Sequence, residues 1–205
     1  MAGRHVPTSF IVAAALGVLV VAGAVPRADV RATKRDAALL KQKVATITAH
    51  GERATKQARR TTVSENEVNS YLAYDAGGQL PAGVVEPSVT ILGTGRVSGR
   101  AVVDLDAVRR QKAPTSLLDP MNYLTGRLPV TATGVLKTSN GVGRFELESA
   151  HVSSIPIPKM LLQEIVSYYS RTPDNPSGIS LDDPFALPAR IREIQVERGQ
   201  AIIVQ

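Results

Sequence analysis

Two segments in which apolar and polar residues alternate constrain the fold more than any other part of this sequence. The alternation runs through Arg127–Lys137 and returns in Val142–Ser149. A period of two is typical of a β-strand that buries one face. Between the segments stand Asn140 and Gly141, which accept the positive φ angles of a tight hairpin turn. The sequence therefore predicts an antiparallel hairpin with one apolar side.

The same pattern predicts two further hairpins. One joins Val84–Leu92, across the turn Gly93–Gly95, to a second strand. Pro87 lacks the N–H group that a strand ladder needs, so the first of these strands is expected at a sheet edge or at a bulge. The last hairpin joins Ala189–Val196 to Ala201–Val204. In the strand after Gly95, the residues expected to face the core are Val97, Ala101, Val103 and Leu105, and those expected to face water are Arg96, Ser98, Arg100 and Asp104.

Two helices are predicted from their end signals. Ser64 and Glu67 form a capping box, in which each side chain binds a free backbone N–H group, so a helix is predicted from Glu65 to about Tyr74, ended by Gly77-Gly78 and Pro81. The second helix, Lys159–Ser170, is apolar over more than the ~100° stripe that a surface helix needs. We therefore expect the α+β class, with a curved antiparallel sheet of hairpins wrapped on a long apolar helix.

The N-terminal part is expected to lie outside this domain. Residues 1–28 combine a short leader, an apolar run from Phe10 to Val25 and small residues, as in a signal peptide or an N-terminal membrane anchor. A helix over that run of roughly 16 residues spans about 24 Å, less than the ~30 Å hydrocarbon core of a bilayer. Residues 29–61 predict a basic helical stalk before the domain of residues 62–205. The stalk is either a solvated linker or a surface for anionic lipid headgroups.

Two cellular locations remain open. A secretory signal implies export to the cell envelope or periplasm, in association with a membrane. Positive charges soon after the apolar run, at Arg27, Arg31, Lys34 and Arg35, favour instead an anchor whose downstream part faces the cytoplasm. The net charge of +6 comes from the first 60 residues, because the remainder carries slightly more Asp and Glu than Lys and Arg.

The sequence lacks the residue groupings that most catalytic and metal sites need. It has no cysteine, and its histidines, His5, His50 and His151, do not have the spacing of a zinc site. His151 stands near serines and Asp104 lies on another predicted strand, but no Gly-x-Ser-x-Gly motif accompanies them. Few aromatic residues and no tryptophan argue against nucleic-acid binding. We expect no catalytic residues, no metal and no other cofactor.

The candidate binding site is a groove between the apolar side of the sheet and the helix Lys159–Ser170. Its walls are mostly aliphatic, which suits extended hydrocarbon chains. A purely structural interpretation remains open, in which the helix is the core helix of a small domain. The residues expected to bind lipid are Val97, Val103, Val130, Leu136, Phe145 and Leu147 on the sheet and Leu161, Leu162, Ile165, Val166 and Tyr169 on the helix.

Short motifs also give the sequence a family resemblance. The capped segment Ser64–Leu72, the strand that begins with Leu128-Pro129-Val130, and Ile155-Pro156-Ile157-Pro158 before the apolar helix stand in an order that resembles the YpmS-type membrane-anchored extracytoplasmic proteins. The pattern is more distantly similar to tubular lipid-binding and AsmA-like domains. The resemblance covers roughly residues 62–205 and implies a curved sheet around a long helix that binds or transfers lipids near a membrane. It carries over no catalytic residue.

Three functional hypotheses follow. The first is a non-enzymatic, exported and membrane-proximal lipid-binding or lipid-transfer protein, whose partners are a lipid or other aliphatic ligand and the membrane surface. The second is a membrane-tethered protein-interaction scaffold with a fully packed core, in which the C-terminal strand Ala201–Val204 offers a free edge to another chain. The third, and least favoured, is a hydrolase that uses His151.

Overall fold

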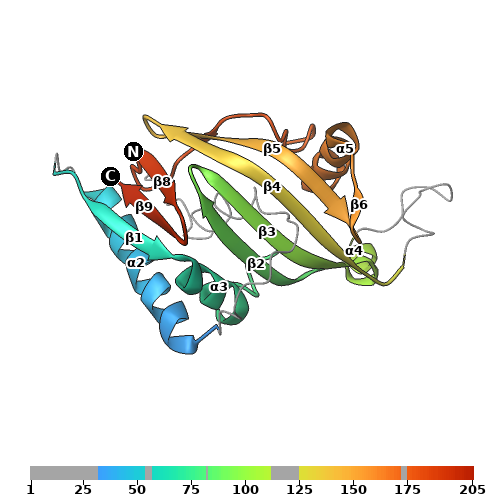
Figure 1. Cartoon of the computed structure of the whole chain (residues 1–205), viewed down its shortest axis with the longest axis horizontal. Helices are drawn as coiled ribbons and strands as arrows, with labels where there is room; N and C mark the ends of the chain where they lie inside the picture. The colour runs from blue at the N-terminus through green and yellow to red at the C-terminus, as the bar shows by residue number, and fades with distance from the viewer. Residues whose placement is uncertain (1–31, 54–56, 82, 112–124, 172–174) are drawn as a thin grey trace, which may run out of the picture.

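The computed structural model describes residues 32–53, 57–81, 83–111, 125–171 and 175–205, which form two antiparallel sheets with helices beside them (Figure 1). The α+β class expected from the sequence is confirmed at this level. The signal peptide or anchor predicted for residues 1–28 lies outside the described residues. Of the helices in the described ranges, none combines the length and the apolar character that a bilayer-spanning segment requires.

The larger sheet contains the hairpins that the alternating segments predict. Its strand order is β2-β3-β4-β5-β6, and the short strand β7 also pairs with β5. The strands are β2 (Val84–Gly93), β3 (Arg96–Asp104), β4 (Arg127–Ser139), β5 (Val142–Val152), β6 (Ile155–Pro156) and β7 (Phe185–Ala186). The helix α4 (Leu105–Gln111) follows β3. Pro87 lies in an edge strand, and the register of β2 shifts between Val85 and Ser88, as expected for a strand that contains proline.

The register brings the predicted apolar residues of the sheet onto one face. Residues directly opposite each other in antiparallel strands share a face. Val97 lies opposite Gly134, and Gly134 lies opposite Leu147, while Leu136 lies opposite Phe145. The same face carries Val103 and Val130. On the other face Ser98 differs from its prediction, because it is only 3% exposed, between its cross-strand neighbours Thr90 and Thr133.

The smaller sheet has the strand order β1-β9-β8. The sequence predicted two of its three strands. Its strands are β1 (Arg60–Ser64), β8 (Glu193–Glu197) and β9 (Gln200–Val204). The hairpin β8–β9 agrees with the sequence, but β1 was not expected. The prediction that the C-terminal strand offers a free edge is wrong, because Ala201 pairs with Val63 of β1 on one side and with Val196 of β8 on the other.

The described part of the predicted stalk is not a solvated helix. Helix α2 (Lys34–Glu52) begins after the N-cap Thr33, whose side chain accepts a hydrogen bond from Asp36 N, and it buries Ala37, Leu40 and Ile47. These residues recur at helical spacing on one side, so α2 is an amphipathic helix with a buried stripe. Helix α3 (Glu65–Tyr74) lies beside it (Figure 1) and starts with the predicted capping box.

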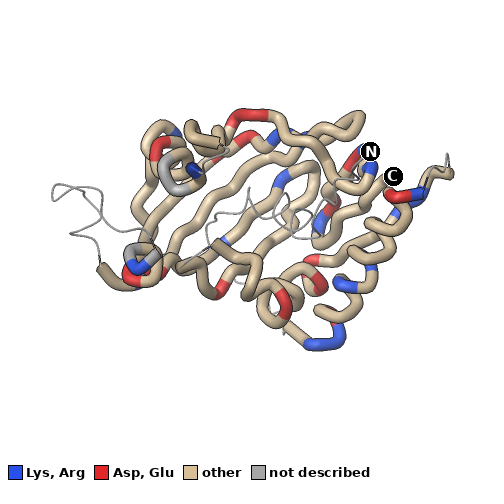
Figure 2. The backbone as a smooth tube through the Cα atoms, turned by 180° about the vertical axis from the view of Figure 1, so that it is seen from behind, with Lys and Arg blue, Asp and Glu red and all other residues tan. Residues whose placement is uncertain are grey.

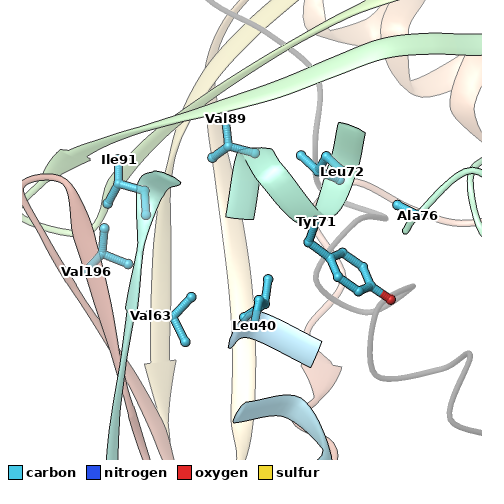
Figure 3. Close-up of a cluster of buried hydrophobic side chains, with 8 residues drawn as sticks. All are labelled: Leu40, Val63, Tyr71, Leu72, Ala76, Val89, Ile91 and Val196. Atoms are coloured by element: carbon cyan, nitrogen blue, oxygen red, sulfur yellow. The ribbon is translucent and has the colours of Figure 1, made fainter. Parts of the chain in front are cut away.

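The main core lies where α2, α3 and the smaller sheet meet one end of the larger sheet. Figure 3 shows its side chains converging from these elements: Leu40, Val63, Tyr71, Leu72, Ala76, Val89, Ile91 and Val196. A second cluster joins Ile47 of α2 to Leu187 and Ile191, which precede β8. The larger sheet is therefore covered thoroughly at this end.

The expected long apolar helix at the centre of a curved sheet is not present in the described residues. Helix α5 (Lys159–Ser170) has 12 residues and lies beside β5 and β6 (Figure 1). The elements that cover the apolar face at the main core are α2, α3 and the smaller sheet, whose contribution depends on residues far apart in the sequence. This explains why a local reading of the sequence assigned that role to α5.

Candidate functional site

Helix α5 is attached to the edge of the larger sheet through the proline-containing segment that precedes it. His151 and Val152 of β5 pair with Pro156 and Ile155 of β6, and Ile157 N donates a hydrogen bond to Ala150 O at 2.8 Å. The prolines cannot donate backbone hydrogen bonds, so the chain leaves the sheet after two paired residues. Helix α5 then begins at once, with Leu162 N donating to Pro158 O.

The inner side of α5 contacts the apolar face of the sheet through Leu162. This side chain packs against the buried Ala132 and Ala150, and the half-buried Ile157, Val130 and Leu147 pack against the same two alanines. The structure thus brings together three of the residues predicted to bind lipid, Val130, Leu147 and Leu162. Only the two alanines of this cluster are fully buried. The core at α5 is therefore much smaller than the main core at the other end of the sheet.

Polar side chains fix a second side of α5. Gln163 Oε1 accepts a hydrogen bond from Leu181 N at 2.6 Å, and Gln163 Nε2 donates to Ile179 O at 3.1 Å. One turn after Gln163, Ser167 Oγ donates a hydrogen bond to Ile179 O. Two turns after Gln163, Ser170 Oγ accepts a hydrogen bond from Ile179 N. These bonds satisfy the backbone of an extended segment that has no strand partner there. They hold α5 in its orientation without burying apolar surface.

The outer side of α5 is apolar and exposed. Met160, Leu161 and Ile165 are 76, 45 and 43% exposed, and Ile155 on the preceding strand is 65% exposed. Successive helical residues are 100° apart, so Met160, Glu164, Leu161 and Ile165 lie within an arc of about 140°. Glu164 is the only charged residue in that arc. We call Ile155, Met160, Leu161 and Ile165 the α5 patch.

The other residues predicted to bind lipid do not form one site with these. Val97 and Leu136 pack against the main core, and Phe145 is buried with its ring over Gly134, where a Cβ would overlap it. Val103 is half-buried near the end of β3, and Val166 is half-buried one turn after Leu162. Leu161 and Ile165 belong to the exposed α5 patch. The side chain of Tyr169 lies outside the described residues.

Three residues of this site, Ile155, Ile157 and Met160, were not predicted from the sequence. Ile157 packs, as Leu162 does, against Ala132 and Ala150, while Ile155 and Met160 are among the most exposed large apolar residues described. A signal was present in the sequence, because every position from Ile155 to Leu162 is apolar or proline except Lys159. That density of apolar residues before and within a short helix exceeds what one buried stripe can absorb.

The arrangement around His151 does not form a catalytic triad. His151 lies opposite Thr131 and Arg100 in the sheet, whereas Asp104 lies opposite Arg127, four residues further along β4. At about 3.3 Å per residue, this places Asp104 roughly 13 Å from the row of His151. Asp104 instead caps α4, and the hydrogen bond from Ala107 N, aided by Arg127, lowers the pKa of its carboxyl group. The described ranges contain no group of three or more His, Cys, Asp or Glu placed to hold a metal ion.

Comparison of the chain with protein-family models and with curated proteins finds no match. The α5 patch and the small cluster beneath it are therefore interpreted from their own geometry.

Proposed function

We propose that the protein is a non-enzymatic, exported, membrane-proximal lipid-binding protein that contacts aliphatic chains with the α5 patch and the adjoining apolar face of the larger sheet. What supports the proposal is the incomplete coverage of apolar surface at α5, where only two alanines are fully buried while four large aliphatic side chains remain exposed. Exposed apolar surface of this kind is typical of membrane or ligand contact sites.

The size of the patch sets the strength of the interaction. Complete burial of a large aliphatic side chain contributes about 1.5–3 kcal/mol, and the four side chains of the α5 patch are already partly covered. Burial of the remaining surface then contributes about 1 kcal/mol for each residue, or ~4 kcal/mol together, which corresponds to a Kd of about 1 mM. Contact of this strength requires a tether that keeps the protein near the membrane. The N-terminal segment predicted for residues 1–28 would supply such a tether.

The charges near the patch indicate that acyl chains, and not anionic headgroups, are what it contacts. Lys159 forms an ion pair with Asp182, and Glu164 and Asp183 add negative charge. The patch therefore has no excess of positive charge to attract anionic lipids. We expect its contact with a membrane to occur on zwitterionic lipids and to change little with salt concentration.

A second candidate function is a membrane-tethered scaffold with a fully packed core. The packing of Leu162, Val130 and Leu147 against the same two alanines, Ala132 and Ala150, favours it, because at this point sheet and helix already cover each other. In that case the α5 patch would meet another protein. The free edge first proposed for such a scaffold at Ala201–Val204 is occupied on both sides.

A single introduced tryptophan distinguishes the two functions, since the chain contains none. In the full-length protein, Leu161→Trp is expected to shift its emission to the blue on phosphatidylcholine vesicles and to be quenched by lipids with brominated acyl chains. The control is Leu39→Trp, at a similarly exposed position on α2. Quenching in the Leu161→Trp variant but not in the Leu39→Trp variant supports lipid contact. Equal quenching in both variants, or in neither, contradicts it and leaves the scaffold.

A further inference from the structure

Four arginines from different parts of the chain meet at one end of the molecule. Arg53 follows α2, Arg59 precedes β1, and Arg190 and Arg192 precede β8. The end of α2, the start of β1 and the end of β9 lie together in Figure 1, and Figure 2 shows both blue Lys or Arg and red Asp or Glu positions beside the mark C. We call these four residues the arginine cluster.

Gln205 holds the elements of the cluster in place. Its backbone N–H donates to Arg59 O at 2.9 Å, and its O accepts from Arg59 N at 3.1 Å, which ties β1 to β9. Its side chain is buried, and Nε2 donates to Ile47 O at 2.8 Å and to Ala189 O at 2.7 Å. One residue therefore connects α2, β1 and the segment before β8. The backbone at Arg59 and Arg192 is therefore held by the smaller sheet, and Arg190 follows Ala189, whose carbonyl group binds Gln205.

The guanidinium groups of the cluster are exposed and largely unused. Arg190 Nη1 donates to Arg53 O at 3.2 Å, and Arg192 Nη2 donates to Gln205 O at 3.0 Å. The side chains of Arg53 and Arg59 make no hydrogen bond within the described residues. Within the same residues, none of the four forms an ion pair with an Asp or Glu side chain, whereas Arg96 pairs with Glu148 and Arg127 with Asp104.

Like charges that lie together, with only two of the four guanidinium groups hydrogen-bonded in the described part of the chain, are unfavourable in the protein alone and become favourable when an anion lies among them. Two acidic residues adjoin the cluster in sequence, Glu52 and Glu193, and Glu193 already accepts a hydrogen bond from Gln195. Each guanidinium presents five donors in a planar fork that matches the oxygens of a phosphate group.

We infer that the arginine cluster is a binding site for a phosphate group, supplied either by a lipid headgroup or by a free phosphate ion. The site is separate from the α5 patch, which lies toward the other end of the long axis of the molecule (Figure 1). It uses electrostatic and hydrogen-bonding contacts, while the α5 patch uses apolar ones. The arginine cluster and the α5 patch are therefore tested by different measurements.

The test compares two full-length variants with the same change of net charge. Arg53→Gln with Arg59→Gln removes two cluster arginines whose side chains make no hydrogen bond in the described residues, so the fold should be unaffected. Arg100→Gln with Arg144→Gln is the control, at two exposed positions on the larger sheet. Urea unfolding of both variants should match the wild type. Should the cluster variant be less stable, Arg59→Gln alone is used.

The first arm uses vesicles of phosphatidylcholine with and without phosphatidic acid. The readout is the ratio of affinities for the two vesicles, so that any apolar contribution cancels. A basic residue near an anionic surface changes affinity about 5-fold, so the cluster variant should lose about 30-fold in this ratio and the control less than about 3-fold. Equal losses in the two variants would mean that only net charge matters, and no loss in either would mean that the cluster does not meet the membrane.

The second arm titrates inorganic phosphate alone, and its outcome identifies the source of the phosphate group. Saturable phosphate binding that the cluster variant loses and the control keeps indicates a site for the free ion. Loss of vesicle preference in the cluster variant, without binding of free phosphate, indicates a lipid headgroup. If the cluster variant and the control behave alike in both arms, the inference is overturned.

Discussion

Asn69 on α3 pairs with Val89 on β2 as a neighbouring strand would. Its Oδ1 accepts a hydrogen bond from Val89 N at 2.6 Å, and its Nδ2 donates to Val89 O at 2.7 Å. One helical turn earlier, Glu65 Oε2 accepts from Ile91 N at 2.6 Å. Because β2 is an edge strand, these backbone groups would otherwise lack partners, and their satisfaction by side chains keeps another chain from adding to this edge.

Replacement of Asn69 by leucine should be strongly destabilising. It leaves the N–H and C=O groups of Val89 without partners in a half-buried place, and each unsatisfied group costs about 1–3 kcal/mol. We expect the free energy of unfolding in urea to fall by about 2–4 kcal/mol. The control is Asn66→Leu on the exposed side of the same helix, which should change stability by less than about 0.5 kcal/mol. Similar effects of the two substitutions would contradict this role of Asn69.

The ion pair between Lys43 and Glu67 should make stability depend on pH. Lys43 Nζ lies 2.6 and 2.8 Å from the two carboxylate oxygens of Glu67 and also donates to Thr62 O. Burial alone would raise the pKa of Glu67, but the hydrogen bonds from Lys43 and Ser64 and the charge of Lys43 outweigh it and hold the pKa below its ordinary value of 4.5. A carboxyl group with a lowered pKa stabilises the fold above its ordinary pKa, and this stabilisation is lost as the pH falls through the folded value.

Lys43→Met removes the pair and leaves the methylene stem in place. At pH 7 we expect the variant to be less stable by about 1–2 kcal/mol, the usual range for a hydrogen bond to a charged group. The difference should shrink below pH 4.5 and disappear at a pH low enough to protonate Glu67 in the folded wild type. Urea unfolding of both proteins at a series of pH values measures this. A difference that stays constant down to pH 2 would show that lost packing, and not the ion pair, is responsible.

Gly51 provides a direct test of whether α2 belongs to the fold. In a solvated helix, Gly→Ala stabilises by about 0.5–1 kcal/mol, because alanine is the better helix former. In the structure a Cβ at Gly51 would overlap the backbone carbonyl of Ala189, which cannot move without disturbing Gln205. We therefore expect Gly51→Ala to destabilise by about 2 kcal/mol or more, the range of overpacked sites.

The control is Gly78→Ala, because a Cβ at that position meets nothing within 4 Å. This substitution should be neutral or slightly stabilising in a urea unfolding experiment. A gain in stability from Gly51→Ala would mean that α2 does not pack on the domain and is the solvated helix that the sequence suggests.

The sequence predicted the local elements well, because their signals are local. The Asn140-Gly141 turn, the capping box of Ser64 and Glu67, and the edge position of Pro87 each depend on residues close together in the chain. The position of β1 depends instead on its pairing with β9, whose residues follow about 140 positions later. The alternation of polar and apolar residues within the five residues of β1 cannot show which distant strand they pair with. Helix α2 was predicted as a helix, but its docking on α3 and the smaller sheet was not, for the same reason.

The sequence predicted that α5 contributes apolar residues to the candidate site, but not which side of the helix faces the sheet. The apolar residues of α5 cover well over half of its surface, so hydrophobic periodicity does not show which part of that wide arc is buried. In the structure the direction is set by Gln163, Ser167 and Ser170, which bind the segment around Ile179 and turn Leu162 toward the sheet. Leu161 and Ile165 consequently face outward. The polar residues of α5 were not considered in the sequence-based prediction of the site. They decide which apolar residues of the helix remain exposed for binding.

That role of Gln163 leads to a prediction about local stability. Its side chain binds Leu181 N, Ile179 O and Ser167 Oγ, so it is the main connection between α5 and the segment that follows. Gln163→Ala should therefore release this segment while the main core, which includes none of the described side chains of α5, stays intact. We expect hydrogen exchange of the Leu181 amide to become at least about 10-fold faster, with a change of less than about 1 kcal/mol in global unfolding. Glu164→Ala, at the neighbouring exposed position, should leave the Leu181 amide unchanged. Unchanged exchange in Gln163→Ala would mean that Leu162 alone orients the helix.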